Sequence, residues 1–132
     1  MKRKSLFLVS VFALFAFVLT ANVGSAKTDF APGATLENFT LPDLDGNQQS
    51  FDKLKGKNGA VLVWLSAQCP VVKQYNERIN QVAAELKAKG INVIGINSNA
   101  TESLDWVKSD AAEVGYKFPV LIDKGNVLAD KL

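Results

Sequence analysis

The chain has 132 residues, of which 15 are basic, 13 are acidic and none is histidine. Three basic residues open the chain, and in the remainder lysines and acidic residues are interspersed. Without a basic block, binding to nucleic acid is not expected. One cysteine and no histidine cannot form a metal site of the usual thiolate and imidazole composition, so we expect no metal and no other cofactor.

Residues 1–26 have the pattern of a signal peptide. The basic start is followed by an apolar stretch, residues 6–19, and by the small residues Gly24, Ser25 and Ala26 where a signal peptidase cleaves. The stretch is shorter than the roughly 20 apolar residues that a membrane span requires, so we expect no stable membrane anchor. An uncleaved N-terminal anchor is the alternative. The pattern predicts export, to a periplasm or out of the cell, and leaves residues 27–132 as one domain.

The exported part is predicted to begin with a hairpin. Residues 38–41 alternate polar and apolar, residues 43–47 (Asp-Leu-Asp-Gly-Asn) have the chemistry of a tight turn, and residues 48–51 can return as a second strand. Leu54 is expected in a short helical turn.

Strands and helices then alternate. Residues 61–65 and 91–96 are continuous apolar runs, typical of strands covered on both faces. Between them, apolar residues recur in steps of three and four from Val72 to Leu86, which predicts a helix that begins at Pro70. Tyr75 and Trp64 are both expected to pack in the core.

The second half of the chain continues this alternation. Thr101 is predicted as the N-cap of a second helix and Gly115 as its stop. Residues 118–122 form a third extended run, and residues 127–132 are expected to begin another helix. This order with short links predicts an α/β fold with a parallel sheet and right-handed crossovers.

Cys69, the only cysteine, is predicted to lie where the first buried strand passes into the first helix. Unpaired N–H groups and the helix dipole favour a thiolate at this position, and the thiolate is the form that attacks disulfides and peroxides. An odd cysteine in an exported protein is a reactive thiol or half of an intermolecular bridge, and a buried inert cysteine is the alternative.

Three neighbours are candidate site residues. Lys73, about one helical turn beyond Cys69, can stabilise the thiolate or remain a solvated surface lysine. Ser66 and Gln68 can bind substrate or cap the helix. Residues 97–99 follow the second strand and are expected at the same end of the sheet as Cys69.

Residues 33–132 resemble the redoxin (AhpC/TSA, peroxiredoxin-like) branch of the thioredoxin-like superfamily. The resemblance rests on the order and spacing of four features: the hairpin ending in Gly46-Asn47, the strand-Cys69-Pro70-helix unit, the run 90–96 and the run 118–123. It implies a thioredoxin-like fold with a parallel βαβ core and an N-terminal hairpin. It also implies a thiol-dependent oxidoreductase or peroxidase with an antioxidant role.

The chain departs from the family pattern at three places. Val72 stands where thioredoxin-type enzymes carry their second cysteine, so no internal disulfide can form. In the peroxiredoxin motif Pro-x-x-x-Thr-x-x-Cys, Ser66 keeps the hydroxyl of the threonine, but Leu62 replaces the proline. The family continues with a Thr-Pro turn, two strands and a helix, which would follow Leu132. We therefore expect a truncated domain, either a fragment or one that a partner completes, in which the outer edge of the first buried strand has no partner.

Two hypotheses about function follow. In the first, Cys69 attacks a peroxide or a protein disulfide, and an external thiol or disulfide reductant completes the cycle. In the second, the chain is a non-catalytic thioredoxin-like module that binds a partner or scaffolds a complex.

Overall fold

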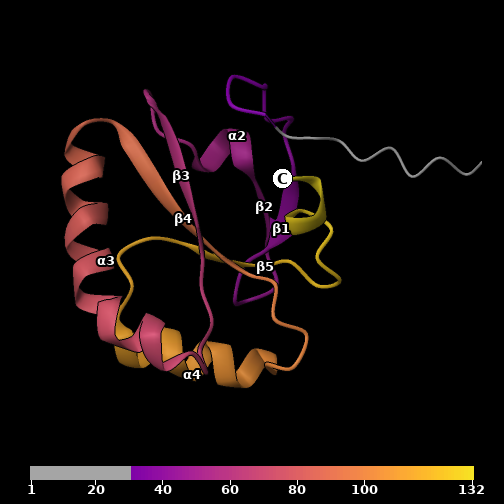
Figure 1. The fold of residues 1–132 in the computed structure, drawn as a ribbon, viewed down its shortest axis with the longest axis vertical. Helices are drawn as coiled ribbons and strands as arrows, with labels where there is room; N and C mark the ends of the chain where they lie inside the picture. The colour runs from indigo at the N-terminus through magenta and orange to yellow at the C-terminus, as the bar shows by residue number, and fades with distance from the viewer. Residues whose placement is uncertain (1–30) are drawn as a thin grey trace, which may run out of the picture.

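A three-stranded parallel sheet forms the centre of the computed structural model, which describes residues 31–132 (Figure 1). Its strands stand in the order β3 (Gly59–Trp64), β4 (Ile91–Asn97) and β5 (Val120–Ile122). The register places Val61 opposite Val93. The parallel sheet predicted from the apolar runs is confirmed. The predicted signal peptide lies outside the described residues.

The N-terminal hairpin is also present. β1 (Thr40–Pro42) pairs antiparallel with β2 (Gln48–Ser50), and the short helix α2 (Phe51–Leu54) follows directly. Asp43 holds the turn because its side chain accepts hydrogen bonds from the backbone N–H groups of Asp45 and Asn47, both at 2.9 Å. Gly46 has a φ of 86°, which glycine adopts without strain.

Two long helices connect the parallel strands. α3 (Pro70–Ala88) begins with proline, whose missing N–H costs nothing at a helix start. α4 (Leu104–Val114) ends at Gly115, as predicted, with a left-handed φ of 63°. The predicted N-cap Thr101 is wrong. Ser103 caps α4, because its hydroxyl accepts the N–H of Trp106 at 3.2 Å.

The chain after β5 forms a single 3₁₀ turn, η1 (Ala129–Lys131), where the sequence predicted the start of a helix. The buried carboxylate of Asp123 organises this turn. It accepts the N–H groups of Leu128 at 3.1 Å and Ala129 at 3.0 Å.

The core lies between the sheet and the hairpin. Ile94, Ile96 and Leu121 are fully buried, and hydrophobic residues of the hairpin and of α2 pack against them. In Figure 1, α3 lies on one side of the sheet, and the hairpin, α2 and η1 lie on the other. Both faces of β4 are therefore covered, as its continuous apolar run predicted.

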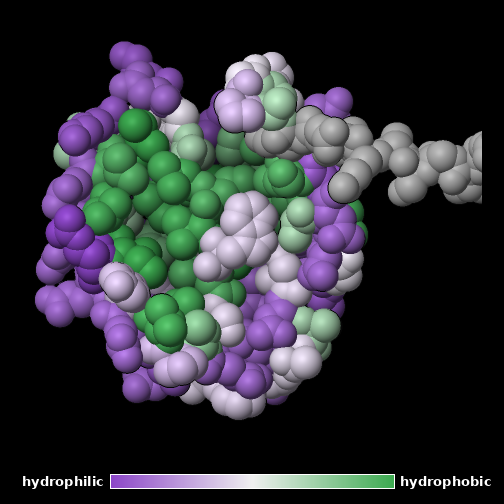
Figure 2. Space-filling view, in the orientation of Figure 1, coloured by the Kyte–Doolittle hydropathy of each residue, from purple (hydrophilic) through white to green (hydrophobic). Residues whose placement is uncertain are grey.

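The outer edge of β3 has no strand partner among residues 31–132, as the sequence predicted. Figure 2 shows hydrophobic surface gathered over this part of the molecule. Two predicted core residues are exposed: Trp64, at the end of β3, is 41% accessible, and Tyr75 on α3 is 57% accessible. Among the described residues, no helix combines the length and the apolarity that crossing a membrane requires.

Candidate active site

Cys69 is the N-cap residue of α3, with an extended backbone (φ −76°, ψ 114°) and a half-buried side chain. The first N–H groups of a helix have no carbonyl partner within the helix, so this end carries partial positive charge. Pro70 contributes no N–H, which leaves those of Val71 and Val72 as the donors nearest the start. The thiol therefore lies where the sequence predicted it.

The segment between β3 and Cys69 is tied to the neighbouring strand. Leu65 is buried, and its N–H donates to the carbonyl of Ile96 at 2.8 Å. The Cys69 N–H then donates to the carbonyl of Ser66 at 3.3 Å, which closes a tight turn. We call residues 66–68 the pre-cysteine loop. It leaves the carboxyl end of the parallel sheet, the end at which ligands of open α/β sheets bind.

A buried carboxylate holds the pre-cysteine loop, and the sequence interpretation missed it. Glu102, in the connection between β4 and α4, is 8% accessible. It accepts hydrogen bonds from five groups: the Ser66 hydroxyl (2.6 Å), the Ala67 N–H (3.1 Å), the Gln68 N–H (2.9 Å) and the side-chain amides of Asn97 (2.7 Å) and Asn99 (3.2 Å). In the sequence, the one signal for this contact was the predicted proximity of residues 97–99 to the end of the sheet at which Cys69 lies.

These bonds decide the charge of Glu102. Burial raises the pKa of its carboxyl group, but the hydrogen bonds from Ser66, Asn97 and the loop amides outweigh that effect. The pKa therefore lies below its ordinary value, and the group is ionised at neutral pH.

The predicted site residues have the following surroundings. The hydroxyl of Ser66 donates to Glu102, and neither Ser66 nor Gln68 caps α3, because the N-cap position is Cys69 itself. The ammonium group of Lys73 lies 3.8 Å from a carboxylate oxygen of Asp110 on α4. The effect of Lys73 on the thiol remains a prediction.

Asp110, which is buried, and Tyr116, which is half-buried, belong to a second polar group, beside α3. Burial raises the pKa of Asp110, although the Lys73 ammonium acts in the opposite direction. Burial also raises the pKa of Tyr116 to about 12, and the Asp110 charge adds to that rise. The Tyr116 hydroxyl donates to the side chain of Asn76 on α3 at 2.9 Å, so this group joins α3 to the end of α4.

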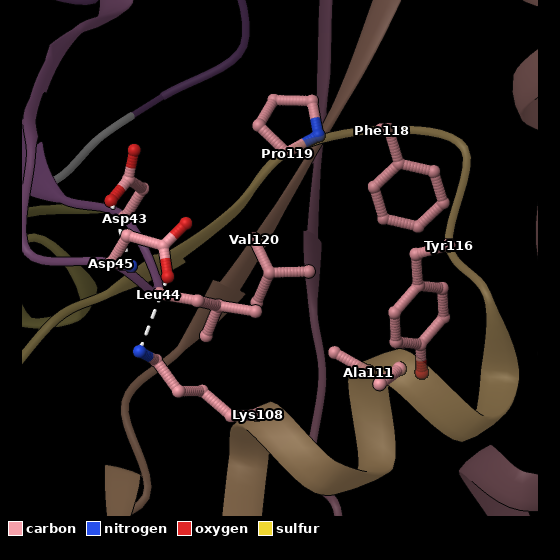
Figure 3. A pocket seen from close by; sticks show the side chains of 10 residues that line it. Asp43, Leu44, Asp45, Lys108, Ala111, Tyr116, Phe118, Pro119 and Val120 are labelled. Carbon is pink, nitrogen blue, oxygen red and sulfur yellow. Dashed lines mark hydrogen bonds and ion pairs between the residues drawn. The ribbon is translucent and has the colours of Figure 1, made fainter. Parts of the chain in front are cut away.

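A depression of about 470 Å³ opens elsewhere, between the hairpin turn, α4 and the segment before β5 (Figure 3). Its wall is mainly apolar, with Leu44, Phe118 and Val120 among its residues. Lys108 and Asp45, which also line it, form an ion pair at 3.2 Å. None of the predicted site residues lines it. Within residues 31–132, no three potential metal-ligating side chains gather.

The fold and the cysteine position define a thioredoxin-like thiol protein. The AhpC/TSA family model matches residues 32–132, and the chain belongs to this family. Both the thioredoxin-like fold and the redoxin resemblance are thereby confirmed.

Individual relatives agree with this assignment. The chain is 29% identical to the thiol-disulfide oxidoreductase ResA of Bacillus thuringiensis over 129 residues, which cover 95% of this chain and 73% of ResA. An uncharacterised conserved protein of Geobacillus kaustophilus has a similar structure, with a TM-score of 0.69, 29% identity, and coverage of 76% of this chain and 56% of that one. A secreted disulfide oxidoreductase of Mycobacterium tuberculosis, homologous to DsbE, has a TM-score of 0.60 and 26% identity. The match covers 70% of this chain and 66% of that protein.

The match to the Geobacillus structure thus spans little more than half of that protein's length.

Proposed function

We propose that the chain is an exported thiol-dependent oxidoreductase that uses Cys69 alone. The observation that carries this proposal is the position of Cys69 as a half-buried N-cap residue at the carboxyl end of a parallel strand. Two of the relatives support it: ResA is a thiol-disulfide oxidoreductase, and the Mycobacterium tuberculosis protein is a disulfide oxidoreductase.

The reaction that fits best is thiol–disulfide exchange. The Cys69 thiolate attacks one sulfur of a substrate disulfide, the S–S bond breaks, and the other sulfur leaves as a thiolate. A mixed disulfide joins Cys69 to the substrate. An external thiol then attacks one of its sulfurs, forms a new disulfide and releases the other partner as a thiolate.

Peroxide is the second substrate class. There the thiolate attacks one oxygen, the O–O bond breaks, hydroxide leaves, and Cys69 becomes a sulfenic acid that external thiols reduce. The hydrogen bond from the Ser66 hydroxyl to Glu102 favours disulfides over peroxides as the substrate. Its only hydroxyl proton is donated to Glu102, so Ser66 can accept a hydrogen bond from a peroxide but cannot donate one. Lys73 is proposed to support the thiolate electrostatically.

A non-catalytic binding module is the second candidate function. The observation that favours it is Val72 in place of a second cysteine, together with the hydrophobic surface at the unpaired edge of β3. In this case Cys69 would not turn over.

Export is part of the proposal. The leader pattern in residues 1–26 supports a periplasmic or secreted location for residues 27–132, and the Mycobacterium tuberculosis relative is described as secreted.

Two measurements separate the two functions. The alkylation rate of Cys69 by iodoacetamide is measured at pH 7 in the folded chain and in the urea-unfolded chain. We expect the folded chain to react about tenfold faster, because the helix start favours the thiolate. Consumption of a small disulfide or of hydrogen peroxide, with a supplied thiol, should fall to background in Cys69→Ser. Equal alkylation rates in the folded and unfolded chains, together with equal consumption by wild type and Cys69→Ser, would favour the binding module.

A further inference from the structure

The buried carboxylate of Glu102 accepts five hydrogen bonds from three segments of the chain. Its oxygen Oε1 accepts from Ser66, Gln68 and Asn99, and its oxygen Oε2 accepts from Ala67 and Asn97. Every partner is a neutral donor, and among residues 31–132 no lysine or arginine forms an ion pair with it. The charge is stabilised by oriented dipoles alone.

Three of the five donors belong to the pre-cysteine loop, and they are consecutive. Two of these are backbone N–H groups, those of Ala67 and Gln68, so the contact fixes the course of the main chain itself. Cys69 is the next residue. The two remaining donors extend from the end of β4 and from the connection after it.

We propose that Glu102 is a positioning residue for Cys69: its carboxylate fixes the pre-cysteine loop and so sets the direction in which the thiol projects from the start of α3. This inference rests on the proposed function of Cys69 as a reactive thiol. Glu102 itself forms no bond to the reacting atoms and acts through Ala67 and Gln68.

The charge of Glu102 and its positioning role predict opposite effects on the thiol. A negative charge near Cys69 disfavours the thiolate, so removing the charge alone would speed alkylation. Loss of the hydrogen bonds to the pre-cysteine loop would move the thiol away from the helix N–H groups and slow alkylation. A slower reaction after charge removal therefore reports positioning.

Two variants use this difference in sign. Glu102→Gln removes the charge, and its amide NH₂ group would face the donors on Ala67 and Asn97, which then lose their acceptor. Glu102→Asp keeps the charge but is shorter by one methylene group. We expect both to slow alkylation at pH 7, Glu102→Gln by about tenfold, as for a misplaced reactive group.

Asp123→Asn is the matched control. Asp123 is fully buried and accepts three hydrogen bonds, from the Ser98 hydroxyl, Leu128 N–H and Ala129 N–H. No bond of Asp123 reaches the pre-cysteine loop. This variant should lose stability but keep the wild-type alkylation rate of the folded protein. Circular dichroism establishes that each variant is folded under the conditions of the assay.

Hydrogen exchange on the wild-type full chain tests the same proposal without a substitution. The amides of Ala67 and Gln68 should be protected at neutral pH and lose protection in acid, when Glu102 is protonated, before the amides of β4 do. Unprotected loop amides at neutral pH, or Glu102→Gln alkylating as fast as wild type or faster, would overturn the positioning role. If Cys69 of the folded wild-type chain were alkylated no faster than Cys69 of the unfolded chain, the proposed function would be overturned, and the positioning role with it.

Discussion

The hydroxyl of Ser66 donates a 2.6 Å hydrogen bond to the carboxylate of Glu102, a residue 36 positions away in the chain. The bond joins the segment that follows β3 to the connection that follows β4. These strands are parallel neighbours, so both segments leave the sheet at the same end. A hydrogen bond to a charged group contributes more to stability than a bond between neutral groups.

Ser66→Ala should therefore destabilise the fold. The substitution removes one of the three donors to Oε1 of Glu102, and we expect a loss of about 1.5–3 kcal/mol in the free energy of unfolding. Urea denaturation measures it. Ser50→Ala is the control, because its hydroxyl donates at 3.0 Å to the neutral side chain of Asn38 in an exposed setting. A loss for Ser66→Ala no larger than that for Ser50→Ala would contradict the prediction.

Glu102 should also make the fold sensitive to acid. Its pKa is below the ordinary value in the folded state, so the folded chain binds fewer protons than the unfolded chain. Its contribution to stability is complete above the ordinary value of 4.5 and is lost as the pH falls through the lower, folded value. Urea denaturation between neutral and acid pH measures this dependence.

Glu102→Gln should flatten that dependence, because the variant has no carboxyl group at this position. Asp43 also has a lowered pKa, chiefly through the hydrogen bond from Gln49. Some acid sensitivity will therefore remain. Identical slopes of stability against pH in wild type and Glu102→Gln would show that the carboxylate is not held as described.

Asp110 should have the opposite influence. Burial raises its pKa in the folded state, so ionisation at neutral pH costs free energy of folding, a cost that disappears as the pH falls below the ordinary value of 3.8. Asp110→Asn should therefore raise stability at pH 7 and have a smaller effect in acid. Thermal unfolding at the two pH values measures the difference.

The ion pair with Lys73 provides the counter-test for Asp110. At 3.8 Å, with the Lys73 side chain 53% accessible, we expect the pair to contribute little. Lys73→Gln should then lower stability only slightly at pH 7. A clear loss of stability in Asp110→Asn would mean that this ion pair outweighs the cost of burial.

The elements of the fold followed from local patterns, whereas the Glu102 contact did not. Pro70, the apolar steps after it and Gly115 are signals contained within one helix, and they predicted the helices that place Cys69. Glu102 meets the pre-cysteine loop only because β3 and β4 are neighbours in the sheet. No feature near residue 102 specifies which of the surrounding polar side chains will be buried.

Tyr75 and Thr101 show where pattern and packing differ. Tyr75 lies on the apolar stripe of α3, but the buried contact of this helix is at Ala83, two turns further on. The periodicity of apolar residues shows which side of the helix faces the sheet. It does not show how much of that side the neighbouring strand covers. Thr101 and Ser103 are both of residue types that are favoured at N-caps. The Thr101 hydroxyl instead bonds to Asn99, which leaves Ser103 to cap α4.

Tyr116 should make the fold sensitive to alkali. Burial and the Asp110 charge raise its pKa to about 12, from an ordinary value of 10.0. The folded chain therefore holds the phenolic proton longer than the unfolded chain, and stability should fall as the pH rises from the ordinary value toward the folded one. Tyr116→Phe should reduce this loss, at a cost of about 1 kcal/mol at neutral pH for the bond to Asn76.

Asp110→Asn tests the cause of the Tyr116 shift. Removing the Asp110 charge should lower the pKa of Tyr116 but leave it above the ordinary value, because burial is the larger cause. Tyrosinate absorbance, compared between each protein and its Tyr116→Phe version, isolates this one phenol. If the pKa of Tyr116 were the same in Asp110→Asn as in wild type, the two side chains would not interact as their positions imply.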